Sequence, residues 1–370
     1  MSWVLAAVGF AARIILHELG HFAAAKAVGM RVERFSLFFP PTLARIRRGE
    51  TEYAIGAVPL GGYVKITGMS PHEELDPEVA PRAYLRQPVW KRVVVIAAGP
   101  AVNLLIAFVI IWALFAVRGQ FVTDVVVDQV APASASAHVL KQGDRILAID
   151  GRKGWEPGLT EAQAQKRQDD LRKVVSAHRC PGSATVAGCR AATPAKVTVQ
   201  RHGRVLHLSI APRYDPQAKR MLLGLTYGRV ADVGVGAAAT LTATKLWDVT
   251  RLTVTGIVRI FYSPEARKQV SGVVGSYEVT RQSFAFDTTQ ALTVLAVISL
   301  SLAIVNLFPF LPLDGGHIFW AVAEKLRGRP IPYRLIERAS VVGFMLVAFL
   351  FIVGLSNDIG RIAGQGFNVR

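Results

Sequence analysis

Four long apolar runs divide the chain, and each predicts a membrane-spanning helix. They cover residues 3–28, 93–117, 291–311 and 339–355. A helix rises about 1.5 Å per residue, so the second run is about 37 Å long and can cross a bilayer with some tilt. The fourth run is of marginal length for a span.

The chain changes character between the second and third runs. Residues from Phe121 to about Gly228 alternate between apolar and polar positions, which is typical of an extramembrane domain. The pattern predicts two strands, a polar helix and a hairpin that turns at His202-Gly203, over residues 122–127, 145–149, 160–178 and 196–210. The stretch from Ala177 to Pro194 is expected to be an inserted loop.

Two further segments carry mixed patterns. Residues 52–67 hold two β-prone runs around Pro59 and Gly61-Gly62, which predicts a hairpin-like loop. Such a loop either dips toward the membrane, where its backbone must be buried in protein or line a wet cavity, or is an ordinary surface hairpin. Residues 235–261 predict an amphipathic helix that lies on the membrane surface or packs on the helical bundle.

Composition agrees with a membrane protein. Of the 370 residues, 51% are hydrophobic, and the mean hydropathy is +0.34. The net charge of +17 is also typical of nucleic-acid binding, but the chain has no nucleic-acid motif. With four apolar runs present, the charge indicates basic cytoplasmic loops and contact with anionic lipid. Lys and Arg concentrate in residues 30–92, which predicts a cytoplasmic segment there and an N-terminus outside.

The first apolar run contains a His-Glu-x-x-His motif. On a helix, His17 and His21 lie four residues apart on one face, where they can hold one zinc ion. Glu18 can take a proton from a zinc-bound water, whose pKa zinc lowers to about 7. Short patterns of this kind recur by chance on soluble helices. Charged groups inside a bilayer, however, are costly and by default indicate function.

A catalytic zinc site needs a third protein ligand. Asp314 follows the third run, at the depth of the His motif, and we expect it to be that ligand. His317 is the alternative, since imidazole also suits zinc. Gly99-Pro100 interrupts the second run, either as a packing kink or to place Asn103, one turn beyond, in the site.

Two cysteines, Cys180 and Cys189, lie outside the apolar runs and lack a Cys-x-x-Cys zinc spacing. A disulfide and two free thiols both remain open. The N-terminal run lacks a basic n-region and contains the His motif, so we expect a retained span rather than a signal peptide.

These features resemble the bacterial site-2 proteases, a family of intramembrane zinc metalloproteases. Three motifs carry the match: His-Glu-Leu-Gly-His at 17–21, Gly-Pro-Ala-Val-Asn at 99–103, and Asn-Leu-Phe-Pro with Leu-Asp-Gly at 306–315. Residues 143–151 resemble the signature of PDZ domains. The chain departs from relatives with two tandem PDZ domains, and it has Val273-Val274 where related sequences often have Pro-Ile.

The resemblance implies a zinc metalloendopeptidase with one zinc ion per chain. The resemblance implies that His17, His21 and Asp314 are the zinc ligands and that Glu18 is the catalytic base. The implied substrate-binding residues are Asn306, Asn103, and Gly61, Gly62 and Tyr63 of a membrane re-entrant β-loop. Implied substrates are single-span membrane proteins, such as anti-sigma factors or remnant signal peptides, that an upstream site-1 protease has already shortened. The PDZ-like domain would help to exclude substrates that have not been shortened.

The expected fold is a polytopic α-helical membrane protein with four transmembrane helices, a re-entrant β-loop and one extracytoplasmic PDZ-like α+β domain. The segments expected in chain order are the first transmembrane helix (1–29), a cytoplasmic segment with the β-loop (30–92), the second transmembrane helix (93–117), the PDZ-like domain (118–232), an amphipathic helix and linker (233–288), the third transmembrane helix with a cytoplasmic loop (289–338), and the fourth transmembrane helix and tail (339–370). We expect the protein to lie in the bacterial inner membrane. Both termini and the PDZ-like domain would be outside the cytoplasm, and the active site would lie toward the cytoplasmic side.

Two other classes of function fit parts of the pattern. A membrane adaptor would use the PDZ-like domain to bind C-termini and keep a relict metal site, but the intact Glu18 argues against this. An ion transporter would use the intramembrane His and Asp groups as a relay. The chain shows none of the internal repeats that many transporter folds carry.

Overall fold

The protein is described by a computed structural model that covers residues 1–70, 73–182, 186–364 and 366. It divides into two compact units, formed by residues 1–114 with 235–370 and by residues 115–234. Parts of the predicted loop 177–194 and of the predicted C-terminal tail lie outside the described residues.

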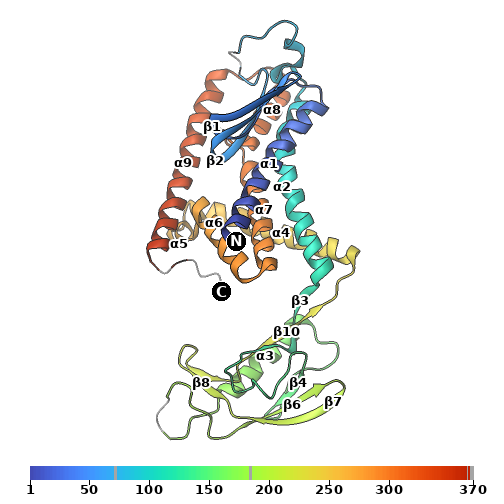
Figure 1. Ribbon diagram of the computed structural model, residues 1–370, viewed down its shortest axis with the longest axis vertical. Coiled ribbons are helices and arrows are strands. Elements are labelled where there is room, and N and C mark those ends of the chain that lie inside the picture. Colours follow the sequence, from blue (N-terminus) through green and yellow to red (C-terminus); the bar gives the residue numbers. More distant parts are fainter. Residues whose placement is uncertain (71–72, 183–185, 365, 367–370) are drawn as a thin grey trace. The chain divides into compact units, whose positions relative to one another are not determined.

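Helices dominate the first unit (Figure 1). Within the described residues, four helices are long and apolar enough to cross a membrane: α1 (Ser2–Ala27), α2 (Val89–Arg118), α7 (Thr288–Asn306) and the part Arg334–Ala363 of α9 (Tyr333–Ala363). The four predicted apolar helices are therefore confirmed, but the bounds predicted for two of them were wrong. Helix α7 ends before residue 311 because prolines follow it. Helix α9 extends beyond 339–355 at both ends, since polar residues that favour helix end the apolar run before the helix itself ends.

Shorter helices complete this unit. They are α4 (Val235–Ile260), α5 (Pro264–Gln269), α6 (Val273–Phe286) and α8 (Asp314–Arg327). Helix α4 confirms the predicted helix over 235–261 and packs on the bundle, where Leu246 joins a core with Ala107 of α2 and Leu300 of α7. Helices α6 and α8 were predicted as a linker and a loop. Both segments have glycines at the start of the helix, and glycine there is typical of loops, so the sequence pattern did not indicate a helix.

A two-stranded antiparallel sheet follows α1 in the chain. Strand β1 (Val32–Arg48) pairs with β2 (Thr51–Ile66), and both lie toward the same end of the unit as α8 (Figure 1). The predicted hairpin within 52–67 was wrong in its pairing. Its two runs both pair with β1, so that Phe35 lies opposite Tyr53 on one side and Val64 on the other. The partner strand was missed because Pro40-Pro41 breaks its pattern.

The sheet is joined to the helices by a small apolar core. Its members come from α1, the turn after it, the sheet, the 3-10 segment Tyr84–Arg86 and α2; the buried ones are Ala25, Met30, Val32, Ile66, Tyr84, Val95 and Ile96. Another 3-10 turn, Ala80–Arg82, precedes it. At the β1–β2 turn, Glu50 accepts hydrogen bonds from Lys26 of α1 and Arg82 at 2.7 Å each. The core and these ion pairs fix the sheet beside the C-terminal half of α1.

The second unit is an α+β domain. Its main sheet has the strand order β10-β3-β4-β6-β7, with β5 paired to β4. The strands are β3 (Gln120–Val130), β4 (Arg145–Ile149), β5 (Arg152–Lys153), β6 (Ala195–Arg201), β7 (Arg204–Ile210) and β10 (Leu225–Ala231), with a separate pair β8 (Arg213–Asp215) and β9 (Arg220–Leu222). Helix α3 (Glu161–Ser176) begins with a capping box formed by Thr160 and Gln163. The predicted strands, helix and hairpin are confirmed.

This unit has its own apolar core. Alternate residues of its strands meet the inner face of α3, so Val197 and Val199 pack with Leu171 and Val175. Cys180 and Cys189 are joined in a disulfide, which resolves the question that the sequence left open. The bridge closes a short loop beside Met221.

Candidate metal centre

Three side chains from two helices meet at the end of the first unit where the sheet lies. His17 and His21 occupy one face of α1, and Asp314 is the first residue of α8. The two Nε2 atoms are 3.3 Å apart, and Asp314 Oδ2 lies 3.5 Å from each of them. Among the described residues, these three form the group of His, Cys, Asp or Glu side chains that could hold a metal ion. His317, the alternative ligand, is not part of that group.

The spacing of these atoms fits zinc. Ligand nitrogens and oxygens lie about 2.0–2.1 Å from tetrahedral zinc, which sets any two of them about 3.3–3.4 Å apart. The three separations in the structure, 3.3, 3.5 and 3.5 Å, are close to this value. Asp314 Oδ2 is buried and has no hydrogen-bond partner in the described part of the chain, as expected for an atom that faces a cation. Two imidazoles and one carboxylate are a ligand set of catalytic rather than structural zinc sites.

His21 is oriented by the backbone of α2. Its Nδ1 donates to the carbonyl oxygen of Val95 at 2.9 Å. This hydrogen bond places the ring proton on Nδ1 and leaves the lone pair of Nε2 directed at the metal position.

His17 is oriented by Asn103, also from α2. The side-chain amide of Asn103 is fully buried and lies 3.0 Å from His17 Nδ1. The oxygen and nitrogen of an amide are interchangeable in such a contact. With Oδ1 facing His17, the amide accepts the Nδ1 proton and frees Nε2 for a metal, and it also satisfies an oxygen that is otherwise unpartnered. Asn103 therefore contacts a metal ligand, where the sequence suggested a contact with substrate.

Glycines allow the two helices to come this close. A Cβ on Gly20 would lie 2.7 Å from the carbonyl oxygen of Ala98, and a Cβ on Gly99 would lie 2.8 Å from His17 Cε1 and closer still to the ring of His21. The Gly99-Pro100 interruption thus makes room for both imidazoles. No feature of the apolar pattern signals this role.

An ion pair holds α8 against α2. Arg92 donates from Nη1 and Nη2 to the two carboxylate oxygens of Glu324, at 3.1 Å and 2.9 Å. Bidentate pairs of this kind fix the geometry of both partners. Asp314 begins the same helix, so this pair helps to fix the third ligand relative to the histidines. From the sequence, Arg92 was considered only as one of the basic residues of the predicted cytoplasmic segment 30–92, and this ion pair was not predicted.

Glu18 faces the sheet. A Cβ on Gly62 of β2 would lie 2.8 Å from Glu18 Cγ, so the absence of a side chain at Gly62 brings the strand onto the carboxylate. The neighbouring residues point elsewhere: Tyr63 accepts from Arg34 at 3.2 Å and stacks on Phe39, whose ring also lies against Gly61. Of the three predicted β-loop residues, the structure brings Gly62 directly to Glu18.

Asn306 completes the cluster. It is the last residue of α7, and its Nδ2 lies 3.5 Å from His17 Nε2. The prolines that follow α7 turn the chain so that Asn306 and Asp314 both reach the histidines of α1.

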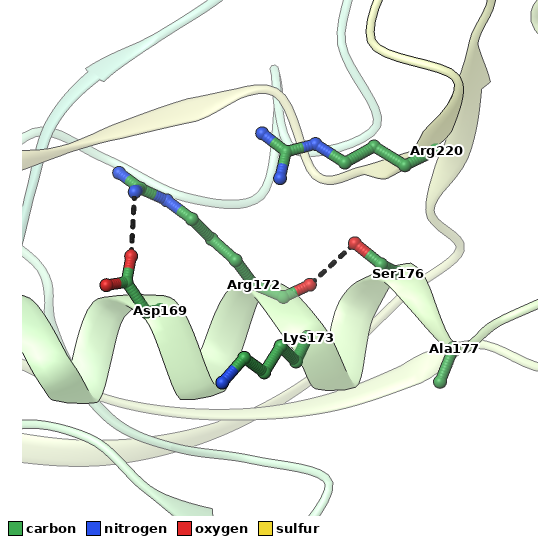
Figure 2. Close-up of a pocket in the computed structure, with 6 residues that line it drawn as sticks. All are labelled: Asp169, Arg172, Lys173, Ser176, Ala177 and Arg220. Atoms are coloured by element: carbon green, nitrogen blue, oxygen red, sulfur yellow. Dashed lines mark hydrogen bonds and ion pairs between the residues drawn. The ribbon is translucent and has the colours of Figure 1, made fainter.

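A separate depression lies in the second unit (Figure 2). Its volume is about 510 Å³, and it is lined by Asp169, Arg172, Lys173, Ser176, Ala177 and Arg220. Polar groups that line it form hydrogen bonds with one another. Asp169 accepts from Arg172 at 3.2 Å, and Ser176 donates to the carbonyl oxygen of Arg172 at 2.7 Å. This depression holds charged surface side chains and no group placed for catalysis.

Two histidines on an apolar helix that is long enough to cross a membrane, together with a carboxylate from α8, define the candidate centre of a membrane-embedded zinc enzyme. The chain belongs to Peptidase family M50, whose model matches residues 5–350, and it is therefore a zinc metalloprotease of the site-2 protease type. It is 32% identical to a "Putative zinc metalloprotease" of Rhizobium meliloti (strain 1021), over 95% of this chain and 94% of that protein. It is also 32% identical to a protein of the same description from Nostoc sp. (strain PCC 7120), over 98% and 97% of the two chains.

Proposed function

We propose that this protein is an intramembrane endopeptidase that cuts single-span membrane proteins within their membrane segment. The observation that carries this proposal is the position of His17 and His21 on α1, a helix long and apolar enough to span a membrane, with Asp314 of α8 against them. Water-soluble substrates have no access to such a depth, whereas a helix within the bilayer does. We further propose that an upstream site-1 protease first shortens the substrate, as the family resemblance implies for anti-sigma factors and remnant signal peptides.

The chain offers a surface that would hold an unwound substrate. Residues 62–66 of β2 pair with β1 along one edge, and within the described residues no other strand pairs along the opposite edge. An extended peptide can add to a free edge through backbone hydrogen bonds. A peptide placed there would lie beside Gly62, and so beside Glu18. Asn306, next to His17, would donate to a substrate carbonyl.

The reaction proposed is hydrolysis without a covalent intermediate. Zinc, when bound, supplies a Lewis acid that polarises the scissile carbonyl and acidifies water. Glu18 takes the proton of the attacking water and passes it to the leaving amine. Asn103 and the Val95 carbonyl hold the two imidazoles in the tautomer that ligation requires.

The second unit is proposed to act as a filter on substrates. Its sheet, its one long helix and the segment 143–151 support a PDZ-like module that lies outside the cytoplasm. The proposed orientation follows the basic residues, which gather in 30–92 and would face the cytoplasm of a bacterial inner membrane. The active site would then lie toward the cytoplasmic side, and both chain termini outside.

The test uses purified protein in liposomes and one single-span substrate in two forms, shortened and unshortened. We expect cleavage within the membrane segment of the shortened form alone. A zinc chelator should abolish the cleavage, and added zinc should restore it. Equal cleavage of both forms would refute the need for prior shortening. Failure of the zinc-loaded protein to cut either form would refute the proposed activity.

A further inference from the structure

Helix α1 carries a second charged group on the face that holds the metal ligands. Arg13 precedes His17 by four residues, which places its Cα about 6 Å farther toward the N-terminus. The stripe of buried residues along α1 includes Arg13, His17, Gly20 and His21. The Arg13 side chain is therefore inside the helical bundle, on a residue one turn from His17, and only 6% of it is exposed.

The contacts of Arg13 leave its charge unpaired. Its guanidinium lies over the ring of Phe10, 4.3 Å from the centroid. That ring packs edge-on against Tyr277 of α6, whose hydroxyl donates to the carbonyl oxygen of Trp3 at 3.0 Å. The aromatic contacts fix the guanidinium in place. Its Nε and Nη1 are buried, however, and have no hydrogen-bond partner among the described residues.

The other buried arginine of the bundle shows what is missing. Arg92 is equally enclosed, with 4% exposure, and its Nε also lacks a partner among the described residues, but both of its terminal nitrogens are paired with the carboxylate of Glu324. An unpaired charge inside a membrane protein is very costly, and a cation–π contact offsets only part of this cost. Intramembrane charges that persist without a structural partner mark binding sites.

The chemistry of the partner follows from the donor atoms. A guanidinium offers only N–H donors and a positive charge, so the partner that suits these free donors is an anionic acceptor such as a carboxylate, to which arginine forms charge-assisted hydrogen bonds. Arg13 and the metal ligands lie on one face of α1, one turn apart, so a ligand held at the metal centre extends toward Arg13 if it runs along this helix. A substrate bound for cleavage is the molecule that reaches this point.

We propose that Arg13 is a subsite that binds a carboxylate of the substrate, close to the scissile bond. This inference rests on the function proposed above. An extended peptide advances about 3.3 Å per residue, so the separation of about 6 Å along α1 corresponds to about two residues. The carboxylate belongs either to an Asp or Glu side chain about two residues from the cut or to the free C-terminus of a shortened substrate. Arg13 is a specificity residue in either case.

The experiment compares four versions of one single-span peptide in liposomes. They carry Asp or the isosteric Asn two residues from the cut, and each has either a free or an amidated C-terminus. Because a hydrogen bond to a charged group is strong, we expect wild type to cut the peptide with the recognised carboxylate about tenfold or more faster, in kcat/KM, than the matching peptide without it. A preference for Asp over Asn identifies a side chain as the ligand. A preference for the free over the amidated end identifies the C-terminus.

The variant Arg13→Met keeps the length of the side chain and removes its charge. Its preference ratio should fall to about one, with bound zinc unchanged, whereas Arg251→Met, an exposed site on α4, should keep the wild-type ratio. Equal cutting of all four peptides by wild type overturns the proposal, and this arm needs no variant. A preference that survives Arg13→Met also overturns it. Cleavage of none of the peptides by wild type refutes instead the protease function on which the subsite rests.

Discussion

Asn103 offers the sharpest test of how the metal centre is built. The side chain is fully buried and touches His17 Nδ1 at 3.0 Å, and its backbone carbonyl accepts from Ser299 of α7 at 2.9 Å. The variant Asn103→Leu keeps a similar volume and removes the acceptor. Without it, no group holds the proton of His17 on Nδ1, so neutral His17 loses the bias that frees Nε2 for zinc.

The size of the effect follows from outer-shell contacts of this kind. Loss of such a partner typically weakens metal binding about 10- to 100-fold, which corresponds to about 1.4–2.7 kcal/mol. Asn103→Asp, which keeps an acceptor, should bind zinc at least as tightly as wild type. Zinc affinity is measured by competition with a chelator in detergent.

Asn306→Leu is the matched control, because Asn306 lies on the other side of His17 and is proposed to act on the substrate. It should reduce cleavage and leave zinc affinity near the wild-type value. A zinc affinity of Asn103→Leu within about twofold of wild type would refute the role given to Asn103.

Three further predictions concern the metal centre, the start of α6 and the β1–β2 turn. Gly99→Ala places a methyl group on both imidazoles and should abolish zinc binding, whereas Gly256→Ala, with open space around it on α4, should not; equal zinc content in the two proteins would contradict this. Asp358 is fully buried and accepts from the backbone N–H of two glycines at the start of α6, at 3.1 Å and 2.7 Å. Asp358→Ala leaves both donors unpaired and should destabilise the protein by about 1–3 kcal/mol for each, measured as a lower Tm, while an unchanged Tm would count against this contact. Glu50 has its pKa lowered to about 2, first by Arg82 and then by a second cation. A lowered pKa in the folded state means that the ion pairs stabilise the fold above pH 4.5 and lose this effect as the pH falls toward 2. With both proteins metal-free, the Tm difference between wild type and Glu50→Gln should shrink as the pH falls over that range. A difference that grows as the pH falls would refute the stabilising role of these ion pairs.

The chemistry of the centre could be predicted from local spacing. His17 and His21 are four residues apart, and a helix of any packing places them on one face. Asp314 could be named because it follows a proline-broken span at the matching depth. The structure places these three side chains together, with Glu18 beside them at the edge of β2.

The supporting contacts could not be predicted because they join distant parts of the chain. The contact of Asn103 with His17 depends on how closely α1 and α2 pack, which Gly20 and Gly99 determine. Strand β1 was missed because its own sequence contains Pro40-Pro41, and its pairing with both halves of β2 supplies the stability that the local pattern lacks. Arg13 attracted no notice in the sequence, because only the packed bundle shows that its charge is enclosed without a partner.

The central claim is that the cluster on α1 and α8 hydrolyses peptide bonds with Glu18 as base. The most direct test is the cleavage of a shortened single-span substrate by purified wild type and by Glu18→Gln, with bound zinc assayed in both. We expect cleavage by wild type alone and the same zinc content in the two proteins. Equal cleavage by the two proteins, at equal zinc content, would contradict it.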